Sequence, residues 1–156
     1  MHIHFVCTGN AYRSRLAETY LKSKLIGKKI KVSSSGIATT KYRLNNGPIC
    51  WYAMRLIKRK NLVPYMSWKE NQTTKEILHD VDLLICMDQT HLDYCQKNLG
   101  YTNKSFEVWN IPDLNNMKDF IPSDISGIKT DINHIQLTEK TFNLIVKKVD
   151  LLLTKI

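Results

Sequence analysis

The chain has 156 residues, of which 43% are hydrophobic and 24% are charged, and its formal net charge is +9 at pH 7. This length predicts one domain over residues 1–156, and without a signal peptide or a bilayer-spanning apolar run we expect a cytoplasmic protein with no membrane insertion. The positive charge suits anionic substrates or is simply a basic surface, and no recognised nucleic-acid motif accompanies it, so no nucleic-acid partner is expected.

The first stretch of the chain predicts a strand, a short loop and a helix. Apolar residues lead to Cys7, a loop follows with Gly9 and Asn10, and the helix starts near Ser14. The backbone N–H groups of such a loop and the positive end of the helix dipole converge on a small volume that attracts an oxyanion. The same field favours a thiolate at Cys7, which would then act as a nucleophile. Arg13 can bring its planar guanidinium back to bind two oxygens of a phosphate-like group.

Hydrophobic periodicity predicts three further strands, alternating with helices. The strands are expected at 28–34, 81–87 and 105–109, and the helices at 15–26, 49–60, 73–79, 88–98 and 137–156. Residues 110–136 read as a long loop that is functional or holds a short helix. The pattern predicts an α/β protein with a doubly wound, four-stranded parallel sheet, helices on both faces and a phosphate-binding loop after the first strand. Ligands bind beyond the carboxyl ends of such strands, where Cys7 and Asp113 both lie.

The run Phe5 to Asn10, followed by Arg13-Ser14 and then by Leu16 to Glu18, resembles the low-molecular-weight protein tyrosine phosphatases and the related thioredoxin-coupled arsenate reductases. The resemblance implies hydrolysis of phosphotyrosine-type aryl phosphates, carried by a protein or a small molecule, with no metal and no cofactor. It also implies that Ser34 braces the phosphate loop and that Tyr42 lies on the wall of the substrate cleft. It does not predict an oligomeric state.

In the mechanism we expect, Cys7 attacks phosphorus and forms a cysteinyl-phosphate intermediate. Ser14 donates a hydrogen bond to the thiolate, and Asp113 protonates the leaving group and then activates water. Asn10 holds the loop, in a conformation with φ > 0 that asparagine tolerates. The expected phosphate-binding residues are Thr8, Gly9, Asn10, Ala11, Tyr12, Arg13 and Ser14.

Five positions depart from the family pattern, and two of them are Asn115 and Asn116, which stand where the family usually has a pair of tyrosines. Leu114 follows Asp113, where the family usually has a proline, and this change could loosen the loop of the acid. Trp68 stands where the family usually has a histidine that supports the loop asparagine. Tyr12 stands where many members carry a second cysteine, so rescue of an oxidised nucleophile by that thiol is not expected.

Two alternatives remain open. An arsenate reductase would use the same anion loop with Cys86 and Cys95 as a thiol relay, although both cysteines also fit a buried core. The other alternative is a catalytically weak relative that binds a phosphorylated ligand, in line with the altered acid loop. No pair among the five histidines has a metal-binding helical spacing, and no metal site is expected.

Overall fold

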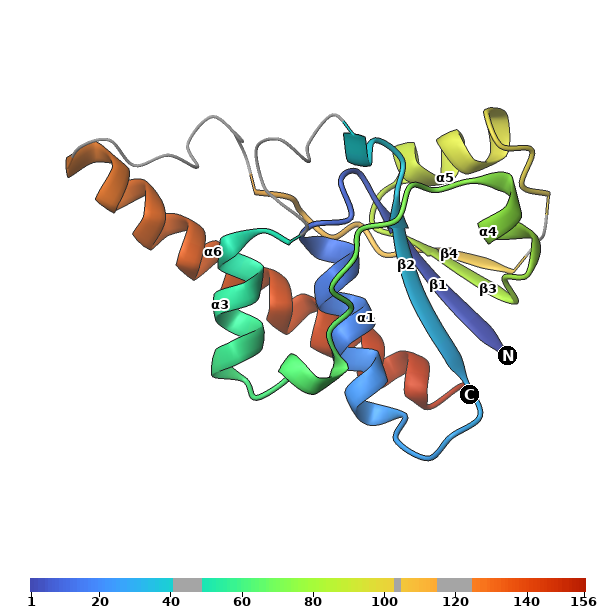
Figure 1. The fold of residues 1–156 in the computed structure, drawn as a ribbon, viewed down its shortest axis with the longest axis horizontal. Coiled ribbons are helices and arrows are strands. Elements are labelled where there is room, and N and C mark those ends of the chain that lie inside the picture. The colour runs from blue at the N-terminus through green and yellow to red at the C-terminus, as the bar shows by residue number, and fades with distance from the viewer. Residues whose placement is uncertain (41–48, 103–104, 115–124) are drawn as a thin grey trace.

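The computed structural model describes residues 1–40, 49–102, 105–114 and 125–156, and it contains a four-stranded parallel sheet (Figure 1). The strand order is β2-β1-β3-β4, and each neighbouring pair is parallel. The strands are β1 (His2–Cys7), β2 (Lys31–Gly36), β3 (Leu83–Cys86) and β4 (Phe106–Val108). The α/β class and the parallel sheet are thus confirmed.

Helices cover both faces of this sheet, as the sequence predicts. The elements are α1 (Arg13–Lys24), α3 (Trp51–Arg59), η1 (Val63–Tyr65), α4 (Lys75–His79), α5 (Gln89–Lys97) and α6 (Ile125–Leu153). Successive side chains of a strand point to opposite faces. Ile3 and Phe5 therefore join the core formed with α1, α3 and α6, while Val6 joins the smaller core under α4 and α5. Because β1 is central, all six of its residues are buried and Cys7 ends the strand at the sheet's carboxyl edge.

The last helix is longer than the sequence predicts. We expected a loop up to residue 136, whereas α6 begins at Ile125, so the expectation is wrong for residues 125–136. This stretch mixes isoleucine with glycine, threonine and asparagine, which are weak helix formers. Contacts with α3 stabilise it instead, because the Tyr52 hydroxyl donates to Asp131 and the Tyr52 ring lies edge-on to His134, with ring centroids 5.1 Å apart.

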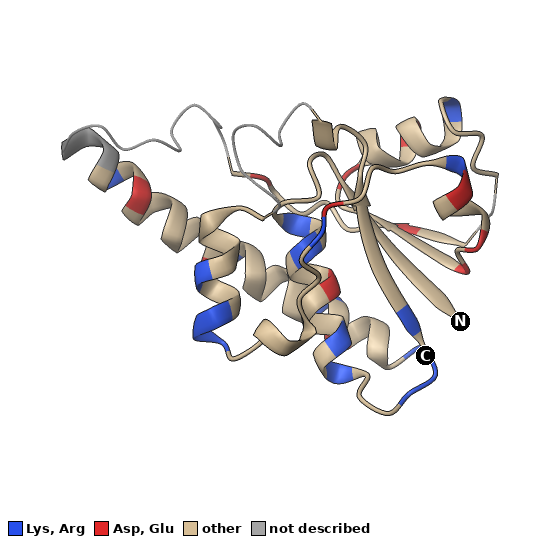
Figure 2. Cartoon of the chain, in the orientation of Figure 1, with Lys and Arg blue, Asp and Glu red and all other residues tan. Residues whose placement is uncertain are grey.

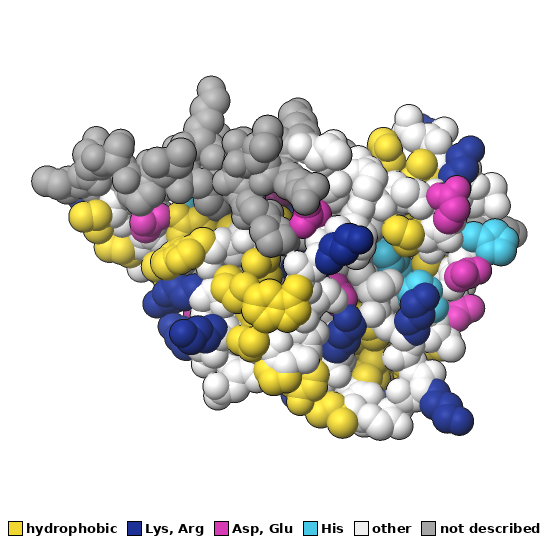
Figure 3. Space-filling model, in the orientation of Figure 1, with side chains coloured by type: hydrophobic (Ala, Val, Ile, Leu, Met, Phe, Trp, Pro, Cys, Tyr) yellow, Lys and Arg dark blue, Asp and Glu magenta, His cyan; other side chains and the backbone are white. Residues whose placement is uncertain are grey.

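The surface combines basic and apolar features. Lys58, Arg59 and Lys60 are exposed at the end of α3 (Figure 2), and Arg59 pairs there with Glu139 of α6. Hydrophobic side chains gather over α3 and its surroundings on the face drawn in Figure 3. Within the described ranges, no helix has the length and apolarity needed to cross a membrane.

Candidate active site

The loop between β1 and α1 forms the floor of a small cavity at the carboxyl edge of the sheet. The cavity has a volume of about 210 Å³. It brings together residues far apart in the sequence, and its lining consists of Cys7, Thr8, Gly9, Ala11, Tyr12, Arg13, Asp113 and Leu114. The predicted nucleophile, guanidinium and acid therefore share one cavity.

Asn10 organises the loop from inside. It is fully buried with φ of 52°, the left-handed conformation that we expected of it. Its Nδ2 donates to Ser14 Oγ at 3.0 Å and to Ser34 Oγ at 2.7 Å, and its Oδ1 accepts from the backbone N–H of Asn71 at 2.9 Å. Because Ser14 Oγ accepts from Asn10, the Ser14 hydroxyl hydrogen is free to donate to Cys7 Sγ, 3.0 Å away.

The predicted brace, Ser34, continues this network into α1. The Ser34 hydroxyl donates to Glu18 Oε2 at 2.5 Å, and Glu18 also accepts from Lys22 at 2.5 Å and from the Ser67 hydroxyl. Sequence reasoning did not predict that Glu18 accepts from Ser34 or that Asn71 donates to Asn10. Glu18 lies within the family-like run and could have been found there, whereas Asn71 contributes a backbone N–H that no side-chain pattern indicates.

The segment before Asn71 is held by a buried arginine rather than by Trp68. The Trp68 side chain is 66% exposed, so it does not replace a histidine inside the network. Arg15 is 1% exposed and donates to the backbone carbonyls of Ser67 and Lys69, the former bond being very short and the latter 2.6 Å. This contact ties α1 to the segment that carries the N–H group bound by Asn10.

Gly36, at the end of β2, packs directly against the loop backbone. A Cβ atom built there would lie 2.6 Å from the nitrogen of Asn10 and 2.6 Å from the carbonyl oxygen of Thr8. No heavy side-chain atom fits at such distances, and the two neighbouring atoms belong to loop backbone, which could shift only at a high energetic cost. A glycine is therefore required for the loop to lie where it does.

Arg13 is 4% exposed, and its guanidinium is held by four oxygens. Nη1 donates to Asp88 Oδ2 at 3.0 Å and to the carbonyl of Ile111 at 3.2 Å. Nη2 donates to Asp113 Oδ2 at 2.5 Å and to Thr8 Oγ1 at 3.2 Å. Buried cations in proteins are paired in this way because desolvation of an unpaired charge is costly.

Asp88 is a partner of Arg13 that sequence reasoning missed. It follows β3 and caps the N-terminus of α5, so the sheet places it at the same edge as Cys7. Burial alone would raise the pKa of Asp88, but hydrogen bonds from Thr90 and Arg13, with the charges of Arg13 and His91, hold that pKa below its ordinary value. Its position directly after a buried strand was the available signal.

Asp113 lies at the mouth of the cavity with 46% of its side chain exposed. Its Oδ2 pairs with Arg13, while its Oδ1 accepts from the backbone N–H of Leu114 at 2.9 Å. The carboxylate therefore faces both solvent and the cation that the nucleophile's loop provides.

A family model described as "Low molecular weight phosphotyrosine protein phosphatase" matches residues 2–124. The chain belongs to this family. A protein-arginine-phosphatase of Bacillus subtilis is 29% identical over 111 residues, which cover 69% of this chain and 70% of that protein. The YwlE arginine phosphatase structure from Geobacillus stearothermophilus superposes with a TM-score of 0.68 at 20% identity, covering 99% and 94% of the two chains. The structure of Vibrio vulnificus Wzb in complex with benzylphosphonate superposes with a TM-score of 0.63 at 24% sequence identity, covering 94% of this chain and 97% of that chain. The two structures show a shared fold.

Not every residue singled out in the sequence faces the phosphatase cavity. Tyr42 lies outside the described residues. Tyr12 lines the cavity, but its hydroxyl donates to Thr138 of α6 at 3.2 Å, and burial raises the pKa of Tyr12 to about 12. Cys86 and Cys95 are fully buried in the smaller core of the phosphatase, away from the lining of the cavity. A hydrogen bond between them, together with burial, raises the pKa of the Cys86 thiol.

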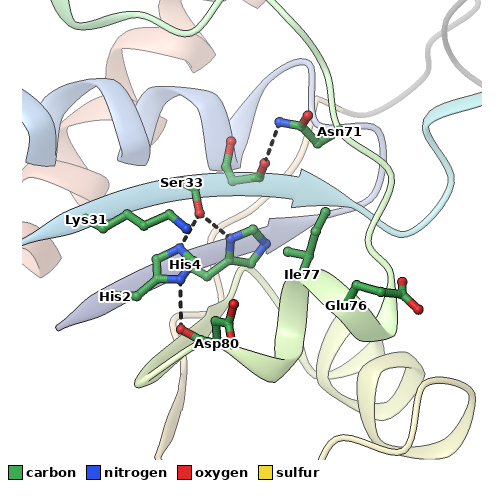
Figure 4. Close-up of a pocket in the computed structure, with 9 residues that line it drawn as sticks. His2, His4, Lys31, Ser33, Asn71, Glu76, Ile77 and Asp80 are labelled. Carbon is green, nitrogen blue, oxygen red and sulfur yellow. Dashed lines mark hydrogen bonds between the residues drawn. The ribbon is translucent and has the colours of Figure 1, made fainter.

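A second cavity of the phosphatase, of about 380 Å³, lies beside β1, β2 and α4 (Figure 4). His2 Nδ1 donates to the carbonyl of Asp80 at 2.9 Å, and Ser33 Oγ lies between His2 Nε2 at 2.6 Å and His4 Nδ1 at 2.7 Å. His4 Nε2 contacts Ser35 Oγ at 2.7 Å, so all four ring nitrogens are hydrogen-bonded. Burial lowers the pKa of His4 to about 3. Across the described ranges, no cluster of three His, Cys, Asp or Glu side chains could hold a metal ion.

Proposed function

We propose that the protein hydrolyses phosphotyrosine-type aryl phosphate monoesters through a cysteinyl-phosphate intermediate, and that residues 1–156 form one phosphatase domain. One observation carries the proposal. Cys7 Sγ has two donors, Ser14 Oγ at 3.0 Å and the N–H of Asn10 at 3.2 Å, on the floor of a cavity that also holds Arg13 and Asp113. Donors aimed at sulfur stabilise a thiolate and the same sulfur as a leaving group.

In the first step the Cys7 thiolate attacks phosphorus, so that an S–P bond forms as the P–O bond to the leaving group breaks. The loop amides and Arg13 hold the equatorial oxygens, on which charge develops. The phosphoryl group takes the place of the Asp113 carboxylate on Nη2 of Arg13, while Asp88 keeps Nη1 oriented. Released from the cation and open to solvent, the Asp113 carboxylate takes up a proton from solvent and donates it to the leaving oxygen as the P–O bond breaks.

In the second step Asp113 accepts a proton from water as the water oxygen attacks phosphorus. The S–P bond breaks, inorganic phosphate forms, and the sulfur leaves as a thiolate that the Ser14 hydroxyl again stabilises. Both steps use side chains and backbone groups that line or support the same cavity, and neither calls for a metal ion or a cofactor.

Phosphoarginine in proteins is the second candidate substrate. The Bacillus subtilis relative, 29% identical over the matched residues, is described as a protein-arginine-phosphatase. The half-exposed carboxylate of Asp113 at the cavity mouth could also pair with a guanidinium leaving group. The assay therefore compares phosphotyrosine and phosphoarginine peptides of the same sequence.

The other two alternatives are less well supported by geometry. An arsenate reductase needs thiols that reach Cys7, but Cys86 and Cys95 are fully buried in the core on the other face of the sheet. A non-catalytic binder of phosphorylated ligands does not need an acid at the cavity mouth, where Asp113 stands.

The test is hydrolysis of para-nitrophenyl phosphate against pH, without metal, for the native protein, Cys7→Ser, Asp113→Ala and the control Cys95→Ala. We expect activity to vanish in Cys7→Ser, to fall by about 100-fold or more in Asp113→Ala, and to persist in Cys95→Ala. Thioredoxin-dependent arsenate reduction that disappears in Cys95→Ala would replace the proposal by the reductase. Phosphate binding without turnover of any substrate would replace it by the binding protein.

A further inference from the structure

The hydrogen-bond partners of His91 determine which of its ring nitrogens carries hydrogen. His91 lies in the first turn of α5 and is 1% exposed. Two groups of Asp88 lie near its Nδ1: the backbone N–H at 3.1 Å, which can only donate, and Oδ1 at 3.2 Å, which already accepts from the N–H and the hydroxyl of Thr90. Nδ1 therefore accepts from the N–H and presents a lone pair. Burial, with the nearby Arg13 cation, lowers the pKa of His91 to about 4, and the ring is neutral near pH 7. The hydrogen of the neutral ring is therefore on Nε2.

This Nε2–H group is directed at the loop of the nucleophile. It donates to Thr8 Oγ1 at 2.9 Å, and Nη2 of Arg13 donates to the same oxygen at 3.2 Å. A hydroxyl oxygen has two acceptor positions and a single hydrogen. Both acceptor positions of Thr8 are occupied, so its hydrogen remains available to a third group. Thr8 lines the cavity together with Cys7 and Arg13, where a bound oxyanion would be that group.

We infer that the Thr8 hydroxyl donates a hydrogen bond to a phosphoryl oxygen of the bound substrate, and that His91 is the positioning residue that orients this hydroxyl. The inference rests on the function proposed above. It adds a side-chain donor to the anion site formed by the loop amides and Arg13.

The position of the hydroxyl also indicates which phosphoryl oxygen it serves. Nη2 of Arg13 contacts both Thr8 Oγ1 and Asp113 Oδ2, so these two oxygens are neighbours around one nitrogen. When the phosphoryl group displaces Asp113 from Nη2, the oxygen that binds there lies next to the Thr8 hydroxyl. Thr8 and Arg13 thus hold the same side of the phosphoryl group, the side from which Asp113 acts.

Four variants separate the hydroxyl from the imidazole that orients it. Thr8→Val keeps the shape and removes the hydroxyl, whereas Thr8→Ser keeps the hydroxyl. His91→Asn keeps an acceptor near the position of Nδ1 for the Asp88 N–H but loses the donor to Thr8, whereas His91→Gln keeps a donor near the position of Nε2. Thr154→Val, at the exposed end of α6, is the matched control.

The experiment measures the affinity for inorganic phosphate, as a competitive inhibitor and by calorimetry, with kcat and KM for para-nitrophenyl phosphate and urea unfolding in parallel. A hydrogen bond to a charged group predicts that Thr8→Val weakens phosphate binding by about 10- to 100-fold. Thr8→Ser should recover most of the loss. His91→Asn should approach Thr8→Val, and His91→Gln should lie closer to the native protein, at equal stability.

Two results would overturn the inference. One is phosphate binding by Thr8→Val within about twofold of the native affinity. The other is an equal loss in both His91 variants, which would reduce His91 to a purely structural residue. If the native protein hydrolyses no phosphoryl substrate, the proposed function fails, but the phosphate affinities still decide the role of Thr8.

Discussion

Replacement of Asn10 by alanine tests how the loop of the nucleophile is built. Alanine in the left-handed conformation, at the φ of 52° observed here, costs about 1 kcal/mol. The variant also loses three hydrogen bonds, to Ser14, Ser34 and the N–H of Asn71, each worth about 1 kcal/mol when buried. We therefore expect the free energy of unfolding to fall by about 4 kcal/mol, together with a loss of activity, because Ser14 is no longer oriented toward Cys7.

The chain offers a matched control for the backbone part of this effect. Asn61, after α3, has φ of 58° and is exposed, so Asn61→Ala carries the same backbone strain without a buried network. Urea unfolding of Asn10→Ala, Asn10→Gly and Asn61→Ala separates the two parts, because glycine removes the strain but not the loss of hydrogen bonds. The reasoning is refuted if Asn10→Ala and Asn61→Ala are destabilised to the same extent.

Three further predictions concern other parts of the molecule. Gly36→Ala should abolish activity and lower the free energy of unfolding, because its Cβ would lie 2.6 Å from the backbone of the loop. The control Gly100→Ala has open space around its Cβ and should lower the free energy of unfolding by only about 1 kcal/mol, so equal unfolding curves for the two variants would contradict this prediction. Burial lowers the pKa of His4 from 6.5 to about 3, so the unfolded chain binds a proton at higher pH than the folded chain does, and the free energy of unfolding falls as pH falls from 6.5 toward 3. In urea unfolding at several pH values, His4→Gln should flatten this pH dependence of stability by up to about 1.4 kcal/mol per pH unit. Asp113→Ala should bind inorganic phosphate several-fold more tightly in calorimetry while kcat falls, because the substitution removes the carboxylate that pairs with Arg13. Weaker binding would show that Asp113 does not compete with phosphate for Arg13.

Much of the fold could be predicted because its signals are local. The apolar residues before Cys7 and the buried run around Leu84 have the patterns of buried strands, and Thr74 has a residue type that favours the N-cap position that it occupies in α4. The start of α6 could not be read in this way, because its first turns are stabilised by Tyr52 of α3 rather than by their own propensity.

The candidate site likewise has features that follow from local sequence and features that depend on tertiary contacts. The sequence by itself determined the chemical groups and their spacing, with Cys7 and Arg13 in one turn and an acid after the last strand, since these depend on short-range geometry. Only the tertiary structure decided that Asp88 and Asp113 share the Arg13 guanidinium and that a backbone N–H of Asn71 holds Asn10. Every residue other than proline has such an N–H, so the contact of Asn71 with Asn10 cannot be predicted from residue types. Strand order decides which carboxylates meet at the sheet edge, so the pairing of Arg13 with two of them cannot be predicted from the residue pattern either.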